Sequence, residues 1–153
     1  MANIAQLVNV LQSVILTDGA RMVKTPTYFV FKMYADHQDA ELVSSSLETK
    51  EAGIEEDNKV KKLYESCSVK DGKLVITLTN LSLDEDENID IVLTEAKAKD
   101  ICGEIVTGAM DDLNTFDAPD KVKTEGFDKF EKTESGLKVT VPAKSVLKLV
   151  VAL

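Results

Sequence analysis

The feature that most constrains this chain is a two-residue alternation of apolar and polar side chains through its middle and end. Residues 63–69 and 74–79 alternate in this way on either side of Asp71-Gly72. A period of two places the apolar residues on one face of a strand. Asp-Gly between two such runs is typical of a tight hairpin turn, which needs a positive φ at its centre. The sequence therefore predicts an antiparallel hairpin at this point.

Further short alternating runs follow, with turn residues and no helical pattern between them. They cover residues 89–93, 101–106, 137–141 and 146–153, and the third run stops at Pro142. Several short strands separated by turns are typical of an antiparallel β-sandwich. We therefore predict a mainly β chain in which residues 38–153 form the sandwich.

The first 37 residues have a different, helical spacing. Apolar residues recur at intervals of three and four, which predicts an amphipathic helix, although the run Val14-Ile15-Leu16, with two β-branched residues, also suits an extended segment. The members of this stripe are Ile4, Leu7, Val8, Leu11, Val14 and Ile15. Asp18-Gly19 predicts a turn. Thr25 as a capping residue before Pro26 predicts a short apolar helix over residues 28–35.

Composition narrows the function classes. The 153 residues carry a net charge of -9, which repels phosphate and anionic lipid, so we expect no nucleic-acid partner and no membrane partner. No apolar run approaches the roughly 20 residues that span a bilayer, and the start lacks the basic region of a signal peptide. Cys67 and Cys102 do not make a disulfide framework; we expect two buried thiols, with a bridge as the alternative.

Four segments, in this order, resemble the C-terminal region of the glycoside hydrolase family 51 α-L-arabinofuranosidases. They are Ala5 to Gln12, Thr25 to Gln38, Leu113 to Phe116 with Pro119 and Val122, and Pro142 to Val146. The resemblance implies a (β/α)8 barrel followed by a jelly-roll-like β-sandwich. Residues 1–37 would then be a helical remnant of the last barrel elements, and residues 38–153 the C-terminal sandwich.

The same resemblance bears on chemistry. The family hydrolyses terminal α-L-arabinofuranosyl groups with retention, which needs two carboxylates about 5 Å apart. The family's glutamates lie in Asn-Glu and Asp-Glu-Trp contexts, and this chain has no tryptophan and no Asn-Glu pair. We therefore expect no catalytic residue here, no cofactor and a structural role. Gln6 matches a family glutamine that contacts the arabinose, so the arabinofuranoside would be bound only together with the parent barrel.

Two further expectations concern partners. Apolar residues of the first 36 would lose their barrel neighbours in the isolated chain, so we expect a homo-oligomer. The alternative function is a free-standing carbohydrate-binding or structural sandwich. Aromatic residues make up 5% of the chain, few for a surface that stacks sugar rings.

Other candidate sites favour simpler interpretations. The residues from Asp84 to Glu95 have the spacing of calcium-loop ligands, but Ile89 stands where that loop needs glycine, so we expect no metal site. The single histidine, His37, is expected to be a hydrogen-bonded residue after the helix. Asn80-Leu81-Ser82 is a glycosylation triplet, a pattern common by chance.

Overall fold

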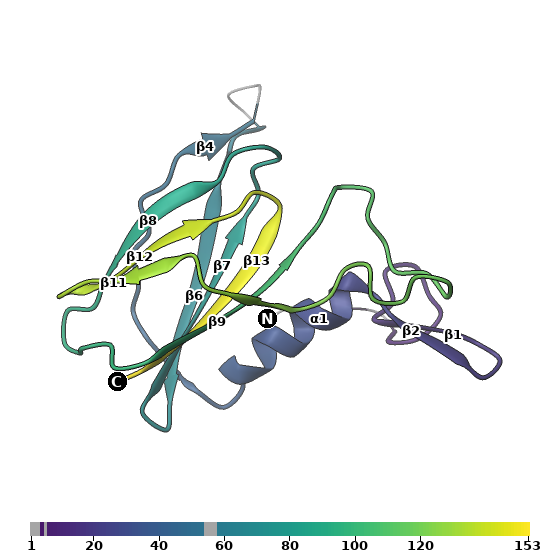
Figure 1. Cartoon of the computed structure of the whole chain (residues 1–153), viewed down its shortest axis with the longest axis horizontal. Coiled ribbons are helices and arrows are strands. Elements are labelled where there is room, and N and C mark those ends of the chain that lie inside the picture. Colours follow the sequence, from purple (N-terminus) through teal and green to yellow (C-terminus); the bar gives the residue numbers. More distant parts are fainter. Residues whose placement is uncertain (1–3, 5, 54–57) are drawn as a thin grey trace.

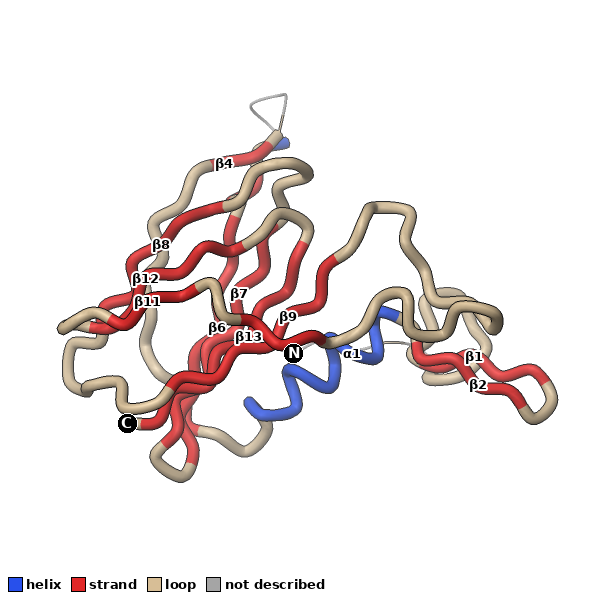
Figure 2. Tube along the Cα trace, viewed as in Figure 1, coloured by secondary structure: helices blue, strands red, loops and turns tan. Residues whose placement is uncertain are grey.

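The computed structural model describes residues 4, 6–53 and 58–153, and two antiparallel sheets dominate it (Figures 1 and 2). The larger sheet has the order β10-β9-β13-β7-β6-β3 and the smaller β11-β12-β8. The larger sheet contains β3 (Glu41–Leu42), β6 (Leu63–Lys70), β7 (Lys73–Asn80), β9 (Ile101–Thr107), β10 (Glu125–Phe127) and β13 (Ser145–Ala152). The smaller sheet contains β8 (Glu87–Val92), β11 (Phe130–Lys132) and β12 (Gly136–Val141). The predicted antiparallel sandwich is confirmed.

The predicted hairpin is the pair β6–β7. Lys70 pairs with Lys73, so the loop has two residues, Asp71 at φ 51° and Gly72 at φ 72°. Both angles are those of a tight primed turn, whose twist matches the strands on either side. The Asp-Gly dipeptide thus fixes the register of one of the two longest strand pairs in the sheet.

The main core lies between the two sheets. Leu147, Leu149 and Val151 of β13 are fully buried, as is Val141 of β12. Residues 74–78 of β7 are all buried, although alternate residues point to opposite faces. Burial on both faces means that the outer face of the larger sheet is covered as well.

The cover on that outer face is α1 (Pro26–Tyr34), followed by the short 3-10 helix η1 (Ala35–His37). The predicted short helix is confirmed, with Pro26 in its first turn. Met33 is 1% exposed and packs with Val106 and Val122. The apolar side of α1 is therefore largely satisfied by the sandwich.

The helix expected over residues 4–15 is wrong for the part that the structure describes. Asn9 and Gln12 have positive φ values of 53° and 62°, which an α-helix does not allow. Residues 15–24 form a hairpin instead, β1 (Ile15–Asp18) with β2 (Arg21–Lys24), and the predicted turn at Asp18-Gly19 connects them. Val14 and Ile15 are β-branched and favour strand over helix, and Ile15 is the first residue of β1.

The charged stretch 48–62 contains the two-residue strands β4 (Glu51–Ala52) and β5 (Val60–Lys61), and its residues 54–57 lie outside the described part. Cys102 is exposed and Cys67 half-buried, so the expectation of two buried thiols is wrong. Their strands are three places apart in the sheet, about 14 Å at normal strand spacing, too far for a disulfide. No described helix is long and apolar enough to cross a membrane.

Candidate functional site

Gln6, the predicted sugar contact, lies in an exposed segment without regular structure. The backbone of its neighbour Leu7 anchors this segment. The Leu7 carbonyl oxygen accepts hydrogen bonds from the N–H of Val14 at 3.0 Å and of Ile15 at 2.9 Å. The Gln6 amide itself makes no side-chain hydrogen bond within the described residues, so both its donor and its acceptor are available.

Thr25 holds the same segment from the start of α1. Its N–H donates to the Val14 carbonyl at 3.0 Å, and its hydroxyl donates to the carbonyls of Ser13 at 2.8 Å and Val14 at 3.1 Å. The expected cap on α1 is therefore wrong in one respect, because the hydroxyl does not bond to the helix. Thr25 instead bonds the start of the helix to residues 13 and 14, the segment just before β1.

Asn114 connects the sandwich to this N-terminal region. It lies in the long loop 108–124 between β9 and β10, which runs beside α1 and the β1–β2 hairpin (Figure 2). Its amide nitrogen donates to the carbonyls of Lys24 at 2.8 Å and Val122 at 2.7 Å. Its amide oxygen accepts from the Val122 N–H at 2.7 Å. At 3% exposure, all three bonds are shielded from competing water.

Arg21 of the hairpin makes a second contact to the same loop. Its guanidinium lies 4.8 Å from the ring centre of Phe116. A cation over an aromatic face contributes on the order of 0.5–1 kcal/mol at an exposed site. The resembling stretch Leu113 to Phe116 therefore supplies both of these contacts to the hairpin.

A charged cluster joins η1 to the larger sheet. The Lys148 ammonium, on β13, lies 2.7 Å from an Asp36 carboxylate oxygen and 2.9 Å from one of Glu104. Lys148 is 8% exposed. Burial opposes its charge, but the hydrogen bonds to both carboxylates outweigh that and raise the pKa of Lys148. The two carboxylates share one cation, an arrangement that links elements and does not resemble an acid and nucleophile flanking a sugar.

His37 adds a neutral link beside this cluster. Its Nδ1 lies 2.7 Å from Ser68 Oγ and its Nε2 lies 3.1 Å from Thr77 Oγ1. Burial lowers its pKa, against the charge of Asp36, and the charge of Lys148 lowers it further. The prediction of a hydrogen-bonded residue after the helix is confirmed.

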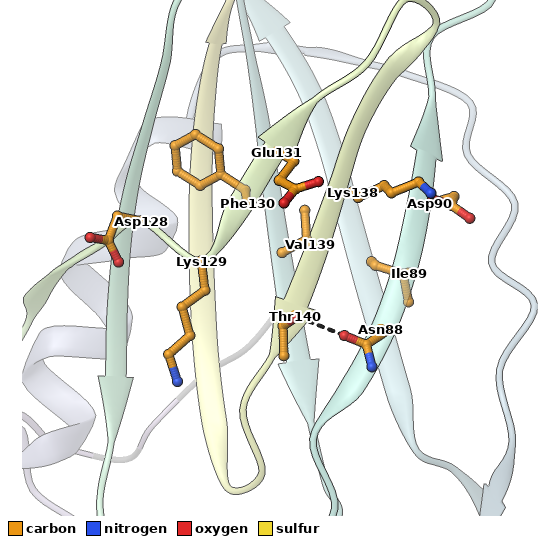
Figure 3. Close-up of a pocket in the computed structure, with 10 residues that line it drawn as sticks. All are labelled: Asn88, Ile89, Asp90, Asp128, Lys129, Phe130, Glu131, Lys138, Val139 and Thr140. Atoms are coloured by element: carbon orange, nitrogen blue, oxygen red, sulfur yellow. Dashed lines mark hydrogen bonds and ion pairs between the residues drawn. The ribbon is translucent and has the colours of Figure 1, made fainter.

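A hollow of about 610 Å³ lies on the outward face of the smaller sheet (Figure 3). Asn88 and Thr140 are joined by a 2.6 Å hydrogen bond, and Lys138 lies 3.9 Å from Asp90. Phe130 also lines the hollow but packs against the main core. The hollow offers polar groups and no freely exposed aromatic face, and it belongs to the sheet that α1 does not cover.

The remaining sequence candidates have structural roles. In the acidic run, Glu85 pairs with Lys62 and Asp86 accepts from the Ala143 N–H at 2.9 Å. No group of three metal-ligating side chains occurs among the described residues. Asn80 of the glycosylation triplet is 2% exposed and donates to the Val141 carbonyl at 3.0 Å, so its amide is not accessible. Burial raises the pKa of the Cys67 thiol, which makes it a poor nucleophile.

The sandwich contacts the hairpin and the helical segment through polar groups of Asn114 and Lys148, both of which are buried. The profile described as Alpha-L-arabinofuranosidase C-terminal domain matches residues 1–145. This chain belongs to that family, the C-terminal domain of family 51 arabinofuranosidases.

Individual relatives agree with this assignment. An intracellular exo-α-L-arabinofuranosidase of Bacteroides ovatus is 43% identical over 151 residues, 97% of this chain and 29% of that protein. The GH51 arabinofuranosidase from Xanthomonas axonopodis pv. citri superposes with a TM-score of 0.92 at 35% identity, over 99% of this chain and 31% of that one. The Thermotoga maritima enzyme in complex with arabinose, at 23% identity, shares the fold with a TM-score of 0.84, over 97% of this chain and 33% of that one. The chain thus spans about a third of the length of these relatives.

The sequence analysis did not identify two residues that join the sandwich to residues 1–37, namely Lys148 and Asn114. Lys148 interrupts an otherwise apolar strand, and a lone lysine in such a run signals a buried ion pair. Asn114 fell within a segment that resembled the family, but spacing gave no sign of its partners, since Lys24 is 90 residues away.

Proposed function

We propose that this chain is the non-catalytic sandwich of a retaining α-L-arabinofuranosidase that removes terminal α-L-arabinofuranosyl groups, and that its role is to hold the last elements of the catalytic barrel. The observation that carries the proposal is the buried Asn114 amide, which bonds the sandwich loop to Lys24 of the hairpin. The family match over residues 1–145 supports the parentage. The missing Asn-Glu and tryptophan contexts support the absence of catalysis here.

The proposed division places barrel elements at residues 1–37 and the sandwich at residues 38–153. Two observations support it. Each strand of the two main sheets lies between Glu41 and Ala152, and η1 ends at His37 with Gln38 already extended. Contacts across the division are polar at Asn114 and Lys148 and apolar at Met33. We propose that this interface survives unchanged when the barrel is present.

Gln6 is proposed as the one residue here that contacts the sugar, in the parent enzyme only. Its exposure and its unpaired amide within the described residues support the role. The buried hydroxyl of Ser13 has no hydrogen-bond partner in the described part of the chain. Buried polar groups are normally hydrogen-bonded, so this hydroxyl is consistent with a partner supplied by the barrel of the parent enzyme.

The test of this function is hydrolysis of a nitrophenyl α-L-arabinofuranoside. We expect no release above a buffer blank from the isolated chain, because glycoside hydrolysis needs both carboxylates. We expect turnover from a longer protein that adds the upstream barrel. Activity of the isolated chain that survives repurification would overturn the proposal, as would an inactive, folded longer protein.

We also propose that the isolated chain associates with further copies of itself to form a homo-oligomer. Leu7 is 62% exposed and Leu11 94%, in the segment assigned to the barrel remnant. At about 25 cal/mol per Å², two such side chains give a modest drive to associate. Sedimentation of the chain and of a Leu7→Glu, Leu11→Glu variant tests this. Monomers in both at tens of micromolar would contradict it.

The alternative, a sugar-binding sandwich, is favoured by the polar hollow on the smaller sheet. Amide, hydroxyl and ammonium groups of Asn88, Thr140 and Lys138 could bond sugar hydroxyls, but no aromatic ring is presented for stacking. NMR shifts confined to these residues on adding arabino-oligosaccharides would support the alternative. Unchanged spectra at millimolar sugar would exclude it.

A further inference from the structure

We propose that Asn114 and Thr25 are positioning residues for Gln6, forming a relay of hydrogen bonds through which a loop of the sandwich sets where the Gln6 amide lies. The inference rests on the proposed function, because it takes Gln6 to contact the sugar. Neither positioning residue itself reaches the substrate in this scheme. The sandwich then contributes to sugar binding without supplying a sugar ligand.

The first half of the relay runs from the sandwich to the hairpin. Asn114 donates to the Lys24 carbonyl at 2.8 Å. Lys24 is the last residue of β2 and pairs with Ile15, the first residue of β1. A shift of the loop is therefore passed to the start of β1 through paired backbone, which bends little.

The second half runs from the hairpin to Gln6. The Thr25 hydroxyl, one residue after Lys24, fixes the carbonyls of Ser13 and Val14. The N–H groups of Val14 and Ile15 both bond to the Leu7 carbonyl. Leu7 follows Gln6 directly, so holding the Leu7 carbonyl fixes the chain one residue from Gln6 and narrows the space that the Gln6 side chain can reach.

The relay joins this segment to the sandwich, while Asn9 adds hydrogen bonds from the segment to Ile15 and Thr17 of β1. Apolar packing adds little, since Leu7 and Leu11 are mostly exposed. By contrast, each polar atom of the Asn114 side chain is bonded at 2.8 Å or less in a buried position. A buried amide with both donors and its acceptor engaged has one orientation.

Accurate placement is what sugar recognition needs. A misplacement of about 1 Å in a contacting group can cost about a hundredfold in rate, even when the change arises far from the chemistry. A looser Leu7 would let the Gln6 amide sample several directions. We therefore expect Asn114 and Thr25 to influence kcat/KM only through Gln6.

The first experiment measures amide hydrogen exchange in the chain itself. Asn114→Asp keeps the acceptor for the Val122 N–H and the size of the side chain, but removes both donors. We expect exchange at Val14 and Ile15 to rise roughly tenfold, the scale of one lost hydrogen bond. The matched control is Asn88→Asp on the smaller sheet, which should leave these amides unchanged. Equal protection in Asn114→Asp and the parent chain would overturn the relay.

A second pair of variants guards against a general folding defect. Thr25→Val replaces the hydroxyl with a methyl group of similar size and should raise exchange at the same amides. Thr25→Ser keeps the hydroxyl and should restore protection. A valine variant that behaves like the serine variant would overturn the second half of the relay.

The closing experiment is a double-mutant cycle in the longer arabinofuranosidase. Gln6→Ala should lower kcat/KM roughly tenfold or more, and Asn114→Asp roughly tenfold. In the Gln6→Ala background, Asn114→Asp should cost less than twofold, because the group it positions is gone. The same tenfold loss in both backgrounds would show a general structural role and overturn the relay, while the proposed function stands. An unchanged kcat/KM for Gln6→Ala would instead refute the sugar contact, and the relay with it.

Discussion

The sandwich and the N-terminal region are held together by different physics. Within the sandwich, Leu147, Leu149 and Val151 are completely buried between two sheets whose register is continuous over whole strands. In residues 6–12 of the N-terminal region, Leu7 and Leu11 are exposed, and hydrogen bonds fix the segment. The sandwich therefore has the features of a unit that folds by itself, whereas the N-terminal region depends on what it is attached to.

The junction between them shows how an apolar and a polar interface share one surface. Met33 of α1 packs on Val106 and Val122, an apolar contact that stabilises without fixing direction. Lys148 and Asn114 add directional contacts on either side of it. Hydrogen bonds restrict the angle of the helix, because they weaken steeply away from their preferred geometry.

The largest expected effect separates the two regions directly. Leu149→Ala should destabilise the chain by about 2–5 kcal/mol, since it opens a cavity at a fully buried position. Leu11→Ala should change stability by less than about 0.5 kcal/mol, because the side chain is 94% exposed. Urea unfolding measures both. Similar costs for the two variants would mean that the regions are not distinct.

A smaller effect is expected at the charged cluster. Asp36→Asn should lower the free energy of unfolding by about 1 kcal/mol, because Lys148 stays buried with one carboxylate in place of two. The effect is no larger because the Asp36 side chain is half-exposed and water screens its charge. Asp90→Asn is the control, since its carboxylate lies 3.9 Å from Lys138 in an exposed pair and should cost little. Thermal unfolding compares them. An Asp36 variant as stable as the control would remove the cluster from the junction.

The smallest expected effect depends on pH. Burial lowers the pKa of His37 in the folded chain, so between that value and the ordinary 6.5 the unfolded chain binds more protons. The contribution of neutral His37 is complete above 6.5 and is lost as the pH falls through 6.5 toward the folded value. The ordinary pKa of a carboxyl group is about 4, below the range from pH 7.5 to 6. The change of stability with pH in that range should therefore be smaller in His37→Gln. Identical slopes in the two proteins would show that His37 does not report on the junction.

The elements predicted correctly share one property, namely that a local pattern decides them. Asp71-Gly72 fixed a hairpin because few other residues adopt its two positive φ values. Pro26 marked the start of α1 because its missing N–H costs nothing there. The spacing of residues 4–15 was also helical, yet no helix forms in the described part of that segment. Leu7 and Leu11 are exposed, so their apolar side chains are not packed against another surface that would stabilise a helix.

By itself, the sequence determined the strands β6, β7, β8, β9, β12 and β13, the short helix and the absence of the family's catalytic contexts, because each is a matter of residue type at short spacing. The short strands β3, β10 and β11 were not predicted. Only the tertiary structure decided how residues 4–37 sit on the sandwich. Asn114 and Lys24 are 90 residues apart, and Lys148 and Asp36 are 112 apart. Contacts at such separations depend on which strands become neighbours in a sheet, a choice made by the burial of the whole core.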